Sequence, residues 1–386
     1  MTIEHSRWLA GLAGLALAVG SGAGCGSNPV TGSVGRVDKP GPAPQLGSGN
    51  HQPSSVVFTE IATEGDGLKT PRDLAFNPLR PDELWAVNLA DESVVIVHAA
   101  TNDTRTAERR KDGYALHFMA KPAAISFGAD ETTIGLPGTF GSCGESRDTY
   151  DDTTVANDFM GPALWSSDLS IFAEKNPHML GSHLDMLHNT PLCMGIEHQE
   201  ANIYWTFDGL TGSISKYDFK KDNGVGNDDH SDGQTFRYVT GQVKYAKGVP
   251  SHLAYHAADQ TLFIADSGNG RIAKLDTTTG QRGTPLKTLE PQGPAVQMNG
   301  AMLEDAVPAG TDLRAPSGLE IHNEILYVSD NASGLIYAYS LDGKQLNFLD
   351  TGLGAGALAG LAFGPDDKLY FVDMTGNRIV RVDPKK

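Results

Sequence analysis

A hairpin pattern recurs along the chain. In each copy an apolar strand ends in Asp or Asn, a short polar turn follows, and a β-branched residue opens the return strand. The five copies are LWAVNLADESVVIV (84–97), IYWTFDGLTGSISKYD (203–218), LFIADSGNGRIAKLD (262–276), ILYVSDNASGLIYAYS (325–340) and LYFVDMTGNRIVRVD (369–383). Their regular recurrence indicates that the Asp and Asn residues hold tight turns. The fixed spacing predicts one repeating β unit.

Each unit begins with a shorter apolar strand. The apolar residues that anchor these strands are Leu74, Ile125, Ile196, Leu253, Leu319 and Leu361. The strand PAAISF at 122 precedes TTIGLPG, which we interpret as a degenerate hairpin. Six such units predict an all-β, six-bladed β-propeller over residues 56–386. We expect the alternating segment 56–61 to supply the outer strand of the sixth blade, because this pairing would leave the ring without an open edge.

The segments LFIADSGNGRI and LYFVDMTGNRIVRVD resemble NHL repeats. The resemblance covers residues 56–386 and implies a propeller of the NHL/TolB-like kind. Such propellers include binding scaffolds, a peptide-amidating lyase and relatives of lactonases, so the function has to be argued from a site. The lyase holds zinc with histidines placed directly after the Pro of the inner strand. Here Ser251 stands at that position before His252, and the lyase ligand pattern does not carry over.

Residues 129–182 lie between the second and third units, carry many polar residues and contain the aromatic residues Phe159, Trp165 and Phe172. The segment is too polar to form a second domain with its own core. We therefore expect a long loop insertion that lies as a cover over one face of the propeller, because loops of this length often serve as lids or binding elements.

The N-terminus carries a targeting signal. Residues 8–20 form an apolar run that is too short to span a bilayer, and small residues then lead to Cys25. This arrangement resembles the lipobox of bacterial lipoproteins, which implies a signal peptide at 1–24 and lipidation of Cys25. We expect the lipid to attach the protein to a membrane. The expected location is the bacterial cell envelope, facing the periplasm or in the outer membrane. Plain secretion is the alternative. Residues 25–55 are rich in Gly, Pro and Ser and predict a flexible tether.

Net charge, cysteine content and missing motifs bear on which partners and which chemistry the protein can have. The formal net charge of −17 disfavours nucleic acid as a partner. Apart from Cys25, the chain has Cys143 and Cys193, and in an oxidising compartment these predict a disulfide. The motifs of serine nucleophiles and of phosphate loops do not occur in the sequence.

Residues that break the repeat are candidates for function. Eight positions before the anchor, two units carry the same residue type, His117 and His188. One position before it most units have Gly or Ala, which suits crowding near the axis, but two have Asp73 and His252. If these four side chains converge at the channel mouth, they suit Zn²⁺ or another divalent metal. Asp73 or Tyr245 would then be the catalytic candidate that handles a proton. The alternative is an ordinary polar funnel.

Two further segments have metal-like composition. Residues 183–198 hold His183, Met186, His188, Cys193, Met194 and His198, a mixture that copper prefers. The apolar strand and the expected disulfide favour a structural role for this segment. Residues 222–233 have a composition similar to that of a calcium loop. A loop that begins at Asp228 would need Glu at its twelfth position, which is Val239, so a solvated acidic turn is favoured.

These observations predict a binding or scaffold protein, whose protein or small-molecule ligand sits at the top face of the propeller, around the channel mouth. A divalent metal in the central channel is part of this expectation. The alternative is a metal-dependent hydrolase or lyase that uses the channel-mouth histidines, with the metal lowering the pKa of a bound water.

Overall fold

The computed structural model describes residues 42–130, 137–148, 150, 155–174, 180–227 and 229–385. The described residues belong to one compact unit. The expected signal peptide, the lipidation site Cys25 and the first part of the expected tether lie outside the described residues.

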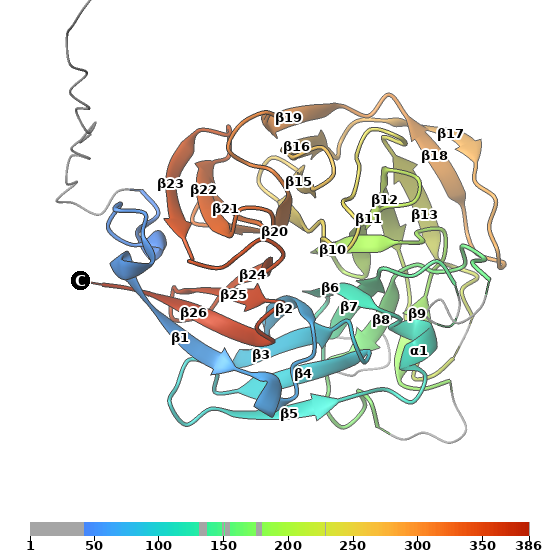
Figure 1. Cartoon of the computed structure of the whole chain (residues 1–386). Coiled ribbons are helices and arrows are strands. Elements are labelled where there is room, and N and C mark those ends of the chain that lie inside the picture. Colours follow the sequence, from blue (N-terminus) through green and yellow to red (C-terminus); the bar gives the residue numbers. More distant parts are fainter. Residues whose placement is uncertain are drawn as a thin grey trace, which may run out of the picture. The chain divides into compact units, whose positions relative to one another are not determined.

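Six antiparallel blades surround a common centre (Figure 1). Blade 1 consists of β2 (Pro71–Asn77), β3 (Arg80–Asn88), β4 (Ser93–His98) and β5 (Thr106–Arg110). Blade 2 consists of β6 (Pro122–Phe127), β7 (Thr139–Gly144), β8 (Ala163–Ser166) and β9 (His183–Met186). Blade 3 contains β10 (Cys193–Glu200), β11 (Ile203–Asp208), β12 (Ser213–Asp218) and β13 (Gln234–Tyr238). Blade 4 contains β14 (Leu253–His256), β15 (Thr261–Asp266), β16 (Arg271–Asp276) and β19 (Leu303–Val307). Blade 5 is β20 (Pro316–His322), β21 (Ile325–Asp330), β22 (Leu335–Ser340), β23 (Gln345–Asp350).

Blade 6 joins the two ends of the repeat region. It contains β24 (Leu358–Phe363), β25 (Leu369–Asp373), β26 (Arg378–Pro384) and, as its outer strand, β1 (Val56–Ala62). The register pairs Val56 with Pro384 and Phe58 with Val382. The prediction that residues 56–61 close the ring is confirmed.

Apolar side chains fill the space between neighbouring blades, because each blade presents a face of β-branched and aromatic residues to the next. The Trp85 ring of blade 1 packs against Phe140 of blade 2, with ring centroids 5.1 Å apart, and against Phe172, 5.3 Å away. All three side chains are fully buried. Phe172 belongs to the segment that the sequence analysis interpreted as a surface cover.

That interpretation of residues 129–182 is wrong in its main point. The segment contains β7 and β8, the two middle strands of blade 2, and Trp165 of β8 is completely buried. The hairpin pattern is hidden because β7, apart from Phe140, is made of small residues. Gly141 packs so closely on blade 3 that a Cβ atom there would lie 2.8 Å from the Ile196 side chain and 2.9 Å from the Tyr204 ring.

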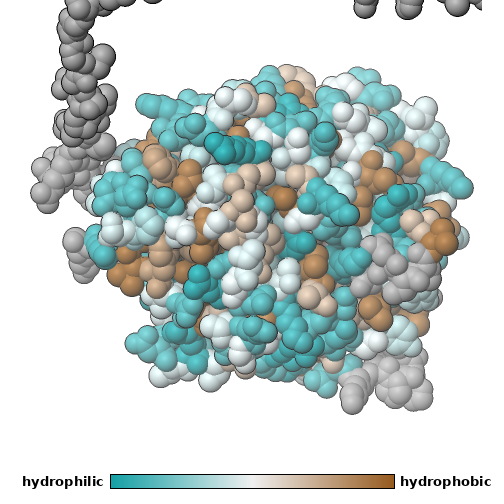
Figure 2. All heavy atoms as spheres, in the orientation of Figure 1, coloured by the Kyte–Doolittle hydropathy of each residue, from teal (hydrophilic) through white to brown (hydrophobic). Residues whose placement is uncertain are grey.

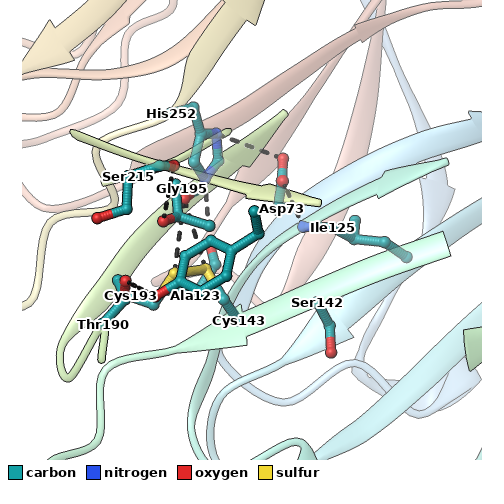
Figure 3. Close-up of a disulfide and its surroundings, with 12 residues drawn as sticks. Asp73, Ala123, Ile125, Ser142, Cys143, Thr190, Cys193, Gly195, Ser215 and His252 are labelled. Carbon is teal, nitrogen blue, oxygen red and sulfur yellow. Dashed lines mark hydrogen bonds and ion pairs between the residues drawn. A yellow bond between two sulfur atoms is a disulfide. The ribbon is translucent and has the colours of Figure 1, made fainter. Parts of the chain in front are cut away.

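The predicted disulfide is present. Cys143 of β7 is bonded to Cys193 at the start of β10, with their Cα atoms 5.4 Å apart. It therefore joins blade 2 to the inner strand of blade 3 (Figure 3).

Blade 3 is extended by a hairpin that comes from blade 4. The connection between β16 and β19 forms β17 (Gln281–Pro285) and β18 (Ala295–Asn299), and β18 pairs in parallel with β13. The long fourth repeat is thus explained by an insertion that widens the neighbouring blade.

The aspartates of the repeat hairpins have the structural role expected of them. Asp208 accepts hydrogen bonds from the backbone N–H groups of Leu210 (2.9 Å) and Thr211 (3.2 Å). Asp373 accepts one from Gly376 (2.9 Å) in the same way. Recurrence of this residue type follows from the turn.

The expectation of a tether that buries nothing is wrong for its described part. Leu46, in the 3₁₀-helix η1 (Pro44–Leu46), is fully buried and packs in the core between blades 5 and 6. The His51 ring stacks on Phe348 of β23, with centroids 3.8 Å apart. Burial of Ala43 and Leu46 contributes to the docking of this Gly- and Pro-rich segment.

The remaining described helical segments are η2 (Pro53–Ser55), η3 (Glu64–Asp66) and α1 (Ala115–Phe118). Within the described ranges, no helix has the length and apolar character needed to cross a bilayer. Figure 2 shows one face, on which hydrophilic residues predominate and apolar ones are scattered.

Candidate functional site

A cavity of about 230 Å³ lies where the six inner strands meet. Residues of β2, β6, β10, β14, β20 and β24 line it, so it is the central channel of the propeller. Most of the lining residues are apolar, but polar atoms make up most of the surface that faces the cavity. Three carboxyl groups and one imidazole belong to the lining: Asp73, Glu197, Glu320 and His252.

Burial and mutual repulsion keep the three carboxyl groups difficult to ionise. Desolvation raises the pKa of Glu197 to about 7, and the pKa values of Asp73 and Glu320 are raised well above their ordinary range by the same cause. The negative charges of Glu197 and Asp73 raise the pKa of Glu320 further. Lys and Arg are absent from the described cavity lining, so no cationic side chain there stabilises the ionised form of these carboxyl groups.

Asp73 is held in place by backbone donors. Its carboxylate accepts hydrogen bonds from the N–H groups of Leu74 and, on the neighbouring blade, Ile125, each at 2.9 Å. Glu197 is held more loosely, by the N–H of Tyr255 at 3.3 Å and by the Ser126 hydroxyl at 3.3 Å.

His252 lies beside Asp73 (Figure 3). Its Nε2 is 3.0 Å from the carbonyl oxygen of Ala123, and its Nδ1 is 3.4 Å from Asp73. A carbonyl oxygen can only accept, so Nε2 carries the proton of the neutral ring. Burial lowers the pKa of His252 to about 4, and the ring is therefore neutral near pH 7.

The structure does not assemble the metal centre expected from His117, His188, His252 and Asp73. Of these residues only Asp73 and His252 line the cavity. His188 follows the outermost strand of blade 2 by two residues, and its Nε2 lies 3.3 Å from Glu290. We expected the whole segment that connects one blade to the next to lie at the channel mouth. This segment begins at the outer edge of a blade, however, and His188 lies near that beginning.

The other two candidates also lie elsewhere. His117 belongs to α1, and its ring packs against Phe118, with centroids 4.3 Å apart, and against Phe159, 5.8 Å away. Tyr245, the second candidate for proton transfer, is outside the cavity lining and packs on Gly209. Neither residue can act on a group bound in the central cavity.

Glu197 and Glu320 were missed by the sequence analysis, although a signal was present. Both stand one position after the anchor residue of their inner strands, where other units have Ala or Ser. Comparing repeat positions on both sides of the anchor would have identified them as departures from the pattern.

The small residues before the anchor are explained by crowding, as expected. A Cβ atom on Gly195 would lie 2.1 Å from the carbonyl oxygen of Ser251, and one on Gly318 would lie 2.2 Å from that of Ala359. The inner strands of neighbouring blades therefore touch backbone to backbone around the cavity.

No family model and no curated protein matches the chain. Solved structures do match it. An auxiliary nutrient binding protein from Bacteroides thetaiotaomicron superposes with a TM-score of 0.54 at 12% identity, covering 86% of this chain and 77% of that one. An auxiliary nutrient binding protein from Bacteroides ovatus gives a TM-score of 0.52 at 14% identity, with the same coverage of 86% and 77%. Identities this low show the fold alone, and together with the six sheets they confirm that the chain is a six-bladed β-propeller.

Proposed function

We propose that the protein is an exported, lipid-anchored binding protein whose central cavity receives a small ligand that carries a positively charged amino group. The observation that carries this proposal is the set of three carboxyl groups, Asp73, Glu197 and Glu320, around one cavity whose described lining holds no Lys or Arg. A cation would supply the missing countercharge and favour the ionised carboxylates.

The arrangement suits an organic ammonium group better than a bare metal ion. Within the described part of the chain, these carboxylates do not form a trio whose ligand atoms lie within 4.8 Å of one another. A divalent metal needs its ligands closer together. The cavity, at about 230 Å³, is small, so it fits a small molecule or the cationic end of a larger one.

The structural neighbours support a binding role, because two of them are named auxiliary nutrient binding proteins. The apolar run at 8–20 and Cys25 support export and lipid anchoring in the envelope of a bacterium. The hydrolase or lyase alternative required His117, His188 and His252 around one metal in the channel. Of these only His252 lines the cavity, and we do not carry this alternative forward.

Titration of the purified protein with matched ligands tests the binding proposal. Primary amines and quaternary ammonium compounds are compared with neutral alcohols of the same size by calorimetry. We expect only the cations to bind, and we expect Glu197→Gln and Glu320→Gln each to weaken binding by about tenfold or more, as loss of a charge-assisted contact does. Glu64→Gln, at an exposed site, is the control. Equal binding of cations and alcohols would exclude the proposal.

Anchoring is tested separately. Cys25→Ser should move the protein from the membrane fraction to the soluble fraction of the envelope, and mass spectrometry of the wild type should find lipid on Cys25. A wild-type protein that is recovered without lipid in the soluble fraction would show plain secretion.

A further inference from the structure

Two histidines and one glutamate from three separate connections meet at the outer edge of blades 2 and 3. His188 lies between β9 and β10, His230 between β12 and β13, and Glu290 between β17 and β18. One ligand atom of each lies within 4.8 Å of those of the other two. This cluster is separate from the central cavity, whose lining includes none of the three.

The distances suit a shared ion. Glu290 Oε2 is 3.3 Å from His188 Nε2 and 3.7 Å from His230 Nε2. Ligands placed about 2.0–2.1 Å from a tetrahedral zinc ion lie about 3.3–3.4 Å from one another. The two rings are perpendicular, with centroids 5.5 Å apart. Two of the three separations are therefore close to those that a shared ion requires, and one nitrogen of each ring lies within 4.8 Å of the other.

The opposite nitrogen of each ring has the partner that metal-binding histidines use. His188 Nδ1 is 2.9 Å from the carbonyl oxygen of Phe159, and His230 Nδ1 is 2.8 Å from the carboxylate of Asp185. Such partners fix the Nδ1–H tautomer and turn the Nε2 lone pair toward the ion. Asp185 is itself completely buried, so the support is rigid.

The arrangement is unfavourable without a cation. The Phe159 carbonyl requires the proton of neutral His188 to be on Nδ1, which leaves an acceptor at Nε2 facing the acceptor oxygen of Glu290. A metal ion between the two atoms would relieve this contact.

We propose that His188, His230 and Glu290 bind a Zn²⁺ ion at the outer edge of blades 2 and 3, with water or an external ligand completing the tetrahedron. Two imidazoles and one carboxylate are typical zinc ligands, whereas Ca²⁺ and Mg²⁺ prefer oxygen alone. The copper set suggested by residues 183–198 does not form, because Cys193 is in the disulfide and Met186 and Met194 are buried in apolar clusters.

The ion would fasten the inserted hairpin. Glu290 belongs to the β17–β18 hairpin, which starts from blade 4, while His188 directly follows the outer strand of blade 2. The site therefore ties together three blades through their outermost segments. This role does not depend on what the central cavity binds.

Metal binding to the tag-free full chain tests the site. The protein is treated with a chelator, dialysed and titrated with Zn²⁺ by calorimetry, and with Co²⁺ by visible absorption, which distinguishes tetrahedral sites. We expect one ion per chain. Loss of a residue that supports a metal ligand weakens metal binding by about 10–100-fold, and we expect this effect for Asp185→Asn. Glu290→Gln removes a ligand itself, so it should weaken Zn²⁺ binding by at least as much.

Glu324→Gln is the matched control. Glu324 Oε2 lies 3.3 Å from His256 Nε2, the same separation as in the proposed site, but on an exposed surface. Both glutamates are partly or fully exposed, so neither variant should impair folding. The proposal is overturned if the wild type takes up no stoichiometric Zn²⁺, or if Glu290→Gln and Glu324→Gln bind it equally well.

Discussion

The Asp73 carboxylate accepts a hydrogen bond from the backbone N–H of Ile125, 2.9 Å away, and so joins the inner strand of blade 1 to that of blade 2. The same carboxylate fills the space where a Cβ atom on Gly360 of blade 6 would lie, 2.3 Å from Asp73 Oδ1. The wall of the central cavity is therefore a ring of inner strands in close contact, and its geometry is set by the packing of the blades.

Because of this contact, adding one methyl group to the wall should be costly. Gly318→Ala would place a Cβ atom 2.2 Å from the Ala359 carbonyl oxygen, and backbone cannot easily move away. We expect a loss of about 2 kcal/mol or more in the free energy of unfolding, measured by urea denaturation. Gly354→Ala is the control, since a Cβ atom there would meet nothing within 4 Å beyond its chain neighbours. Equal stability of the two variants would contradict the crowding.

The disulfide should stabilise the fold through the unfolded chain. Cys143 and Cys193 close a loop of 50 residues. On the chain-entropy argument, Cys143→Ser should lower the free energy of unfolding by about 4 kcal/mol. Cys193→Ser and the double variant should show the same loss, because any of the three removes the same bond. Additive losses from the two single variants would indicate that packing of the sulfur atoms dominates.

The segment before β1 should contribute to stability. Leu46 is completely buried in the core between blades 5 and 6, so Leu46→Ala should cost about 2–5 kcal/mol in thermal or chemical denaturation. Leu289→Ala, at a side chain that is 42% exposed, should change stability by about 0.5 kcal/mol or less. A neutral Leu46→Ala would mean that the segment is a tether after all.

Glu197 should make stability fall as the pH rises. Burial raises its pKa to about 7 in the folded protein, compared with about 4.3 in an unfolded chain. Between these values the folded state binds more protons, so the free energy of unfolding decreases with rising pH. We expect Glu197→Gln to exceed the wild type in stability at about pH 8 by no more than about 3 kcal/mol, since the cavity gives the side chain some access to water.

Near pH 4 the two proteins should be equally stable, because Glu197 is protonated in both states. Urea denaturation at several pH values measures the difference. The exposed Glu64→Gln variant should follow the wild type at every pH. A stability difference between Glu197→Gln and the wild type that does not change with pH would show that the carboxyl group is not the cause.

The repeat spacing was sufficient to predict six blades and ring closure, because the strand ending in Asp and its turn are local features that each unit repeats. Blade 2 escaped the pattern. Its strand β7 reads TFGSCG, and its faces are buried by close approach of Tyr204 and Ile196, which leaves no alternation of apolar and polar residues to detect. The disulfide was predictable because only two cysteines remained for it.

The clusters of functional side chains were harder to predict. The histidine-rich segment 183–198 and the acidic segment 222–233 each have metal-like composition on their own, and His230 and Asp185 bring them together at 2.8 Å. Glu290 reaches the same place from an insertion of blade 4. Contacts between outer edges of different blades have no regular spacing along the chain, so no sequence pattern pairs them.

The pairing of β1 with β26 also fixes an order of events in time. Thr59 and Asp383, which are hydrogen bonded across these strands, stand 324 positions apart in the chain. During synthesis β1 emerges first and stays unpaired until β26 has been made. Until then blades 1–5 can assemble only as an open arc, with β1 as an unpaired strand. A chain that crosses a membrane unfolded could therefore complete its ring only after residues 378–384 have passed through.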